Sequence, residues 1–520
     1  MRSTFMGLET ARRGMFTQQS ALYTTGHNIS NANTPGYTRQ RINFAQTEPY
    51  PGIGMNRPQI PGQMGTGVEA GTVQRIRESF LDLQYRTENT KMGYYGAMSE
   101  SLTKMEEIIN EPSENGLHST LEKFWNALQD LSSHTENTGA RDVVAATGQM
   151  VADTLNYYHN SLSRVQEDIG NQVGVKVDEI NAIVAQIDHL NKQIASVEPH
   201  GYLPNDLYDE RDLLVDSLSQ LVNVKVTNVV PNTYGDAKPM AAGLYNIEIV
   251  QKDGKSYNPP INLISVTKES GIVGTNKVEL EKNEESGLVT GLKIGSTSFT
   301  QFETLSGELS GLINSYGYEA GGSAKGAYPE MLDKLNRMAS AFAKEFNEIH
   351  KNGYALGADT VSGLDFFEFD EDNPAQSMKV NQALLDDSSK IAAAAEKGGA
   401  SGDNKNAQLL ADLRKKSFSD YTSLTDDEKS KLNGSLDSYY SGIIGRLGVD
   451  SQSAKKDLKN SLVLADSVDR NRQSVSAVSL DEEMTNMIKF QHAYNASARN
   501  ITVVDEMLDK IINGMGVVGR

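Results

Sequence analysis

Histidines and carboxylates are the side chains of this sequence that could carry chemistry. Eight histidines are present, and the two closest in sequence, His189 and His200, are eleven residues apart. Helical metal sites place their ligands three or four residues apart, and zinc proteases carry the pattern HExxH. Neither arrangement occurs in the sequence. We therefore expect no metal ion and no cofactor.

Motifs for nucleotides and activated nucleophiles are also missing. The sequence contains no GxxxxGK[ST] phosphate loop and no GxSxG nucleophile elbow. Residues 65–70 fit the relaxed dinucleotide pattern GxGxxA, but a Pro-Gly loop precedes them where that motif requires a strand. These observations favour a protein that is not an enzyme.

Carboxylates gather around one arginine at residues 208–212, in the order Tyr-Asp-Glu-Arg-Asp. A catalytic site would need a second group of reactive side chains, and the sequence offers none nearby. We interpret the segment as the start of a helix, with Asp206 as the N-cap and Arg211 paired with an aspartate.

Composition narrows the class of protein further. The 520 residues include no cysteine, and 49 Lys+Arg against 68 Asp+Glu give a net charge of −19. The acidic balance argues against a nucleic-acid partner, because such proteins present a basic face. No run of 18 apolar residues occurs, so we expect no membrane insertion. The N-terminus has no apolar stretch of the kind found in cleaved secretory peptides.

Proline placement and hydrophobic periodicity predict long helices. No proline occurs between Ser113 and Glu198 or after Pro374, whereas five of the 14 prolines fall between Pro35 and Pro61 in a segment expected to be loop or extended chain. Within the longest helical segment, apolar residues recur every seven positions at Val173, Ile180, Ile187 and Ile194. Apolar spacing of 3.6 residues predicts helices at about 1–30, 80–109, 117–132, 140–197, 328–350, 451–475 and 479–513.

A β-rich segment interrupts the helices. Residues 221–300 alternate β-branched and polar residues between Gly, Asn and Asp turns, and residues 64–80 suggest a hairpin or short strands. The expected fold is mainly α with an all-β insert, a long-helix bundle and a nested layout in which the terminal helices pair as a coiled coil. The expected domains are a terminal region (1–55 and 476–520), a helical rod-like middle domain (56–220 and 301–475) and a β-rich outward insert (221–300).

Both chain ends carry a seven-residue repeat of apolar side chains. The repeats predict an assembly seam in which each end pairs with the other or with further copies. Small or polar residues between them weaken each repeat, so we expect the ends to be disordered until a partner arrives. Residues 1–50 hold five Arg against two Glu, and residues 478–520 hold four cations against six carboxylates, which favours mutual pairing. The seam consists of Leu8, Met15, Leu22 and Ile29 near the N-terminus and of Leu480, Met487, Tyr494, Ile501 and Leu508 near the C-terminus.

A dense turn sequence ends the first predicted helix. Asn side chains bond locally to the backbone and tolerate left-handed φ, and Thr-Pro-Gly can close a tight turn. We expect an ordered junction between the terminal helix and the rest of the chain. The junction turn comprises Asn28, Asn31, Asn33, Pro35, Gly36 and Tyr37.

At both ends the sequence resembles a known family. ALYTTGHNISNANTPGYTRQ (21–40) resembles the N-terminal signature of bacterial flagellar rod, hook and hook-associated proteins, and residues 479–514 resemble the matching C-terminal signature. Internal segments at 205–212, 402–407 and 438–448 are similar to those of the hook-associated proteins that join hook to filament. Residues 221–300 carry no such match.

The resemblance implies a structural component of the bacterial flagellum. Members of this family leave the cell by type III export and assemble at the distal end of the hook, outside the cell. The implied partners are further copies of the chain in a ring of eleven, the hook protein, a second hook-associated junction protein, and an export chaperone at the C-terminal region.

Three other interpretations share part of this evidence. Another flagellar axial protein, such as the hook protein or a distal rod protein, would carry the same end motifs. A non-flagellar surface adhesin could also contain coiled coils, but that class normally needs a cleaved signal peptide and an anchor. An enzyme with an unnoticed site is the third alternative, although the β-rich segment contains no histidine.

Overall fold

The computed structural model describes the chain except for residues 1–4, 56–57, 59–60, 399–401 and 515–520. The chain forms two compact units. Unit 1 comprises residues 1–89, 180–277 and 462–520, and unit 2 comprises residues 90–179 and 278–461. The helices α2 (Ser79–Ile109), α4 (Thr138–Val197) and α12 (Leu436–Ser476) each contribute residues to both units.

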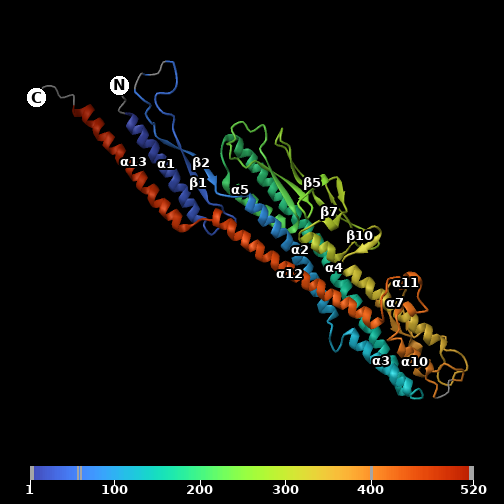
Figure 1. Ribbon diagram of the computed structural model, residues 1–520. Coiled ribbons are helices and arrows are strands. Elements are labelled where there is room, and N and C mark those ends of the chain that lie inside the picture. Colours follow the sequence, from blue (N-terminus) through green and yellow to red (C-terminus); the bar gives the residue numbers. More distant parts are fainter. Residues whose placement is uncertain (1–4, 56–57, 59–60, 399–401, 515–520) are drawn as a thin grey trace, which may run out of the picture. The chain divides into compact units, whose positions relative to one another are not determined.

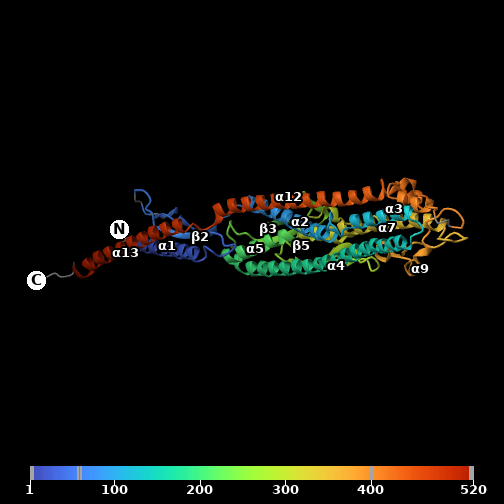
Figure 2. The ribbon, with the colours of Figure 1, turned by 90° about the horizontal axis from the view of Figure 1, so that it is seen from below.

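Unit 1 brings the two chain ends together. Its first and last helices, α1 (Phe5–Ser30) and α13 (Leu480–Gly514), lie side by side in both views (Figures 1 and 2). The expected pairing of the terminal helices is therefore present. The other α-helices and strands that lie wholly in this unit are β1 (Gln40–Gln46), β2 (Val68–Arg75), α5 (Asn205–Leu221), β3 (Val224–Val229), β4 (Leu244–Val250), β5 (Ser256–Val266) and β6 (Val273–Thr275).

Two antiparallel sheets complete unit 1. The strands β3, β4, β5 and β6 pair in sequence order, and Leu244, Ile247 and Leu263 of this sheet are fully buried. The second sheet is the hairpin of β1 and β2, in which Gln40 lies opposite Arg75 and Gln46 opposite Val68. The sequence predicted strand structure at 64–80, whereas β1 lies in the stretch expected to be loop or extended chain.

Unit 2 contains helices and a five-stranded sheet. The strands β11, β10, β8 and β7 follow one another in space, with β9 paired to β8. The main elements are α3 (Leu117–Ser133), β7 (Val278–Lys282), β8 (Val289–Ile294), β9 (Thr297–Phe299), α6 (Glu308–Tyr316), β10 (Tyr318–Ala320), β11 (Ser323–Lys325) and α7 (Ala327–Asn352). Shorter elements follow at α8 (Pro374–Ser377), α9 (Gln382–Asp386), α10 (Lys405–Asp412) and α11 (Asp426–Ser430), with a two-residue pair of β12 (Phe367–Glu368) and β13 (Lys379–Val380).

Aromatic side chains fill the core of unit 2. Phe124 of α3 contacts Phe342 and Phe346 of α7, with ring centroids 6.3 and 5.5 Å apart. Phe366 and Phe367 close the cluster, since their rings lie 4.9 and 5.4 Å from that of Phe346. All five side chains are at most 2% exposed. Such contacts in edge and tilted geometries stabilise beyond the area that they bury.

The predicted long helix at about 140–197 is confirmed. α4 spans Thr138–Val197 without a break, as the absence of proline allows. Val173, Ile180, Ile187 and Ile194, which recur every seven residues, are at most 1% exposed. Burial of one apolar row on a long helix is what holds such a helix in a bundle. Within the described residues, we find no helix whose length and hydropathy would let it span a membrane.

Candidate functional site at the paired terminal helices

α1 and α13 pack antiparallel along a row of small side chains. Gly7 faces Val504 and Gly14 faces Ser497, because a Cβ added to either glycine would lie 3.7 or 3.2 Å from them. Twenty-one residues after Gly7, Asn28 bonds to Glu483. The sum of the two residue numbers is constant in these pairs, as an antiparallel register requires. Small side chains at the contact let two helix backbones approach closely.

The residues of the predicted seam lie on these two helices. Leu8, Met15, Leu22 and Ile29 on α1 and Met487, Tyr494, Ile501 and Leu508 on α13 are half-buried, whereas Leu480 is 47% exposed. Their proposed role in assembly stays a prediction. The seven-residue repeat consists of large apolar residues and therefore gave no sign of Gly7 and Gly14.

Large apolar side chains remain exposed on the helix pair. Several of them lie between 45 and 59% exposed, and exposed apolar surface on a helix favours contact with a further surface. On α1 these are Phe5 and Phe16, and on α13 they are Met484, Ile488, Val503, Met507 and Ile511.

The junction turn is built around the amide of Asn28, which is 1% exposed. Its Nδ2 donates to the Gln40 carbonyl at 2.8 Å and to Glu483 Oε2 at 3.0 Å. Its Oδ1 accepts from the Tyr37 hydroxyl at 2.8 Å and from the Gln40 backbone N–H at 3.0 Å. Arg39 Nε donates to the other oxygen of Glu483 at 2.8 Å. Hydrogen bonds thus join the turn directly to the start of α13.

The other predicted turn residues have different surroundings. Asn31 Nδ2 donates to the His27 carbonyl at 3.1 Å, and Gly36 adopts the left-handed conformation at φ +78° that favours glycine. Asn33 and Pro35 are exposed. Burial raises the pKa of the Tyr37 hydroxyl, and the nearby carboxylates of Asp206, Asp209 and Glu483 add to that effect.

The carboxylates of the 206–216 segment form a buried ion network. Asp212 Oδ2 lies 2.8 Å from Arg75 and 3.2 Å from Arg77, and its Oδ1 accepts from the Tyr245 hydroxyl at 2.6 Å. Burial alone would raise the pKa of the Asp212 carboxyl, but the surrounding arginines outweigh it and hold that pKa well below its usual range. Asp209 accepts from the Thr38 N–H at 2.9 Å, which ties the junction turn to α5.

The same network reaches the C-terminal part of the chain. Asp216 binds Arg86 of α2 at 2.7 Å and Arg472 of α12 at 2.5 Å. Arg472 also lies over the ring of Tyr85, 4.1 Å from its centroid. Three separate stretches of sequence therefore meet on one face of α5.

The predicted roles of Asp206 and Arg211 were wrong. The N-cap position of α5 is Pro204, with no side-chain cap bond, and the carboxylate of Asp206 instead accepts from Gln40 Nε2 at 2.9 Å. Arg211 Nη1 donates to Asn191 Oδ1 and the Gly243 carbonyl, and its guanidinium stacks 3.4 Å from the centroid of Tyr245. Sequence could not reveal this, because these partners lie on α4 and the sheet of unit 1.

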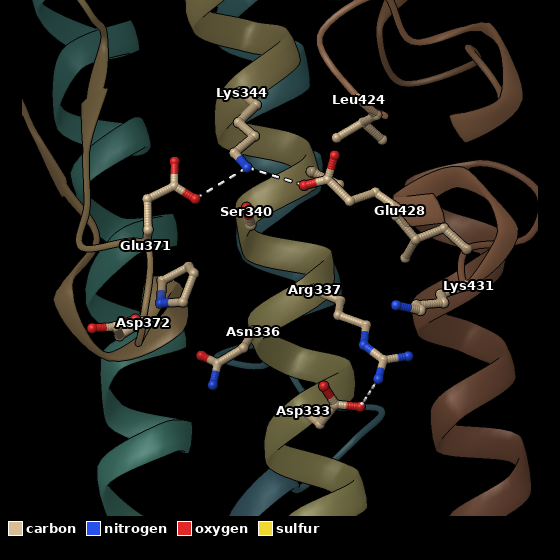
Figure 3. Close-up of a pocket in the computed structure, with 13 residues that line it drawn as sticks. Asp333, Asn336, Arg337, Ser340, Lys344, Glu371, Asp372, Leu424, Glu428 and Lys431 are labelled. Carbon is tan, nitrogen blue, oxygen red and sulfur yellow. Dashed lines mark hydrogen bonds and ion pairs between the residues drawn. The ribbon is translucent and has the colours of Figure 1, made fainter. Parts of the chain in front are cut away.

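A pocket of about 290 Å³ opens in unit 2 (Figure 3). Lys344 of α7 lies between two carboxylates, 3.1 Å from Glu371 and 3.0 Å from Glu428. Arg337 pairs with Asp333 at 2.5 Å on the same helix. Four carboxylates and three cationic side chains line the pocket, and we assign it no chemistry. Among the described residues, no group of three or more His, Asp or Glu side chains is placed to hold a metal ion.

Comparison with known proteins agrees with the arrangement of the chain ends. Residues 102–367 match the family described as flagellar hook-associated protein FlgK helical domain. Residues 471–514 match the C-terminal family of flagellar basal body rod FlgEFG proteins, and residues 8–38 match the flagella basal body rod protein family. The two terminal matches cover α13 and most of α1.

Full-length relatives extend the comparison to the whole chain. The sequence is 45% identical over 529 residues to flagellar hook-associated protein 1 of Bacillus subtilis, covering 100% of both chains. It is 25% identical to the protein of that name from Escherichia coli, covering 97% of this chain and 99% of the relative. The solved structure of the flagellar hook junction protein FlgK from Burkholderia pseudomallei shares the fold, with 14% identity, a TM-score of 0.54, and coverage of 77% of this chain and 100% of that chain. The chain belongs to the flagellar hook-associated protein 1 family.

Proposed function

We propose that this chain is a structural subunit of the junction between the flagellar hook and the filament. The observation that carries the proposal is the antiparallel pair of terminal helices, on which several large apolar side chains stay exposed. In water such side chains favour burial against further subunits. Full-length identity of 45% to a hook-associated protein 1 supports the same role. The role is mechanical, and we propose no catalytic activity.

The proposed assembly has defined neighbours. Copies of the chain form a ring, for which we adopt eleven members, at the distal end of the hook. The hook protein lies on one side of the ring, and a second hook-associated junction protein lies on the other. Before assembly, the chain passes through the flagellar type III export channel, with a chaperone bound near α13.

We propose a separate role for each of three parts of the chain. Residues 1–55 and 476–520 are the assembling region, disordered in the free subunit and ordered by contact with other subunits. Residues 56–220 and 301–475 form the rod-like middle domain. Residues 221–300 form a module that faces outward. Half-buried seam residues such as Ile501 support this division, because a helix pair with so little burial gains stability from added neighbours.

The test is deletion of the gene, followed by electron microscopy of the cells and an immunoblot of the medium for flagellin. We expect hooks without filaments, and flagellin lost to the medium. Loss of the hooks as well would place the chain lower in the axis, as a hook or distal rod protein. Normal flagella would overturn the proposal.

A further inference from the structure

Asparagine followed by glycine is a dipeptide that can change its covalent structure without an enzyme. Asparagine is a thermally labile residue, and glycine has no Cβ to keep its backbone nitrogen away from the side-chain carbonyl carbon of the residue before it. The chain contains four such pairs, at 115–116, 352–353, 433–434 and 513–514. The first three belong to unit 2, whereas the fourth belongs to the terminal region of unit 1. The three pairs of unit 2 therefore share one folded environment in which their reactivity can differ.

Hydrogen bonds hold two of these three pairs. The Gly353 N–H donates to a backbone carbonyl of α7 at 3.2 Å, and Gly353 is buried. Asn352 Nδ2 donates to the carbonyl and to the carboxylate of Glu348 at 2.8 and 3.0 Å. The Gly116 N–H donates to the Ser113 carbonyl at 3.3 Å, and Gly116 is buried as well. In both pairs the backbone nitrogen must leave its hydrogen-bond partner before it can react.

The third pair, Asn433 and Gly434, lies in the turn between α11 and α12, and both residues are exposed. Neither the Asn433 side chain nor the Gly434 N–H forms a hydrogen bond with any of the described residues. The residues around them are held, because the Gly434 carbonyl accepts from the Phe418 N–H at 2.9 Å and the Ser435 N–H donates to Ser438 Oγ at 2.8 Å. The amide of Asn433 and the nitrogen of Gly434 are therefore adjacent, open to water and without a partner among these residues.

We infer that Asn433 is the site at which folded unit 2 deamidates. The Gly434 backbone nitrogen loses its proton to base in the solvent and attacks Asn433 Cγ. The new N–Cγ bond forms and the Cγ–Nδ2 bond breaks, so that ammonia leaves with a proton from water and a succinimide ring remains. Water then opens the ring at either of its carbonyl groups and gives aspartate or isoaspartate. The net reaction consumes one water and releases one ammonia, with no oxidant or reductant.

Either product changes the turn that leads into α12. A carboxylate replaces a neutral amide shortly before Leu436, where α12 begins. Isoaspartate also routes the backbone through Cβ, which lengthens the chain between Leu432 and the Gly434 carbonyl. Leu432 is 5% exposed, and the Gly434 carbonyl is bound to Phe418. The isoaspartate form must therefore move the buried Leu432 or break the hydrogen bond from Phe418.

Incubation of the purified full chain at mildly alkaline pH tests the inference, because base generates the attacking nitrogen. Samples taken over time would be digested, and mass spectrometry of the peptides would follow the conversion of each amide to a carboxyl group. We expect Asn433 to convert at least about fivefold faster than Asn115 and Asn352, which is the change in rate that corresponds to one hydrogen bond. The matched variant is Asn433→Gln, which keeps an exposed amide but would have to close a larger ring. We expect position 433 of this variant to stay unmodified over the same time.

The same incubation in concentrated urea separates the effect of the fold from the effect of the sequence. In the unfolded chain the three pairs lose their hydrogen bonds and their burial, so we expect them to convert at similar rates. Conversion of Asn433 in the folded chain no faster than that of Asn115 and Asn352 would overturn the inference. A lead of Asn433 that persisted unchanged in urea would also overturn it, because the lead would then come from the neighbouring residues in sequence and not from the exposed turn.

Discussion

Contacts between the two chain ends converge on Asn28. Its buried amide makes four hydrogen bonds, to Tyr37, to both backbone groups of Gln40 and to the carboxylate of Glu483. A buried carboxylate such as Glu483, which is 2% exposed, needs these donors because desolvation destabilises an unpaired charge. The junction turn therefore fixes where α13 begins relative to α1.

Replacement Asn28→Asp tests this role without a change of side-chain size. The Nδ2 donor becomes an oxygen that faces Glu483 Oε2 at 3.0 Å and the Gln40 carbonyl at 2.8 Å. We expect the packing of the terminal helices to weaken by about 3 kcal/mol. The measurement compares the amount of the chain in isolated flagella with the amount in the medium. We expect the share in flagella to fall sharply for the variant. Asn33→Asp, at an exposed position of the same turn, should assemble normally; equal incorporation of both variants would refute the role of Asn28.

His350 makes the stability of unit 2 depend on pH. It is fully buried, its Nδ1 donates to the Leu364 carbonyl, and its Nε2 accepts from the Ala392 N–H, so the ring is neutral. Burial lowers the pKa of His350 to about 4, below the value of 6.5 of a free histidine. Between these two values the unfolded chain binds the proton more readily, and the free energy of unfolding falls as the pH falls.

Protonation of His350 should lower the free energy of unfolding by about 3 kcal/mol between pH 7 and pH 4. Urea unfolding of unit 2 at several pH values would measure it against His350→Gln, which lacks the titrating ring. The difference between wild type and variant should shrink or reverse as the pH falls below 6.5. A difference that stays constant across this range would show that His350 does not titrate as proposed.

Individual residues also show where sequence reasoning reached its limit. The seven-residue row on α4 and the helix at 117–132 were predicted, because in each case the whole apolar pattern lies within one stretch of sequence. The partners of Asp209, Asp212 and Asp216 were not, because the arginines lie far away in sequence on β2, α2 and α12. Gly7 and Gly14 were missed because a close helix contact carries no large apolar side chain to signal it.

At the scale of elements, α5 is the point where three stretches of sequence are joined. Asp212 is 3% exposed and forms ion pairs with Arg75 of β2 and Arg86 of α2. It also accepts a hydrogen bond from the hydroxyl of Tyr245 of β4. Ion pairs at the surface contribute little, but removal of one partner from a buried network leaves charges unpaired. The network therefore holds the hairpin, α2 and the sheet of unit 1 to α5.

Replacement Asp212→Asn should destabilise unit 1 of the free subunit by about 3–5 kcal/mol. The substitution keeps the shape of the side chain and removes the charge that faces the arginines. Urea unfolding of the purified chain would measure the effect, with Asp206→Asn as control, since Asp206 is exposed. If both variants unfolded at the same urea concentration as the wild type, the ion network would not hold α5 in place.

Limited proteolysis tests the assembling region as an element of its own. We expect cleavage of the purified subunit to remove roughly residues 1–55 and 476–520 first, because few buried apolar contacts hold the helix pair in isolation. Mass spectrometry of the early fragments would identify the cut sites. Protection of both ends at times when the middle of the chain is cut would mean that α1 and α13 are already stably packed before assembly.

At the scale of the whole molecule, the two ends of the chain meet, since α1 packs against α13. The expected class, mainly α with a β insert and paired terminal helices, is confirmed, and the chain shares its family with hook-associated protein 1 of Bacillus subtilis over its full length. The strands of residues 224–299 are divided between the sheets of units 1 and 2. The alternation of β-branched and polar residues predicted the strands. It does not indicate which sheet each strand joins, because strand pairing depends on contacts between residues that are distant in sequence.

The most direct measurement is a count of filaments on cells that carry the variant Ile501→Asp as their only copy of the chain. Ile501 lies half-buried at the centre of α13, and a carboxylate there would be desolvated in the assembled seam. We predict a variant that melts within about 2 °C of the wild type as a free subunit, enters the medium, and leaves hooks without filaments. The control is a strain that carries Val361→Asp as its only copy, at a position 49% exposed in unit 2. We expect this strain to have wild-type numbers of filaments. Wild-type numbers of filaments with Ile501→Asp would contradict assembly through the paired terminal helices.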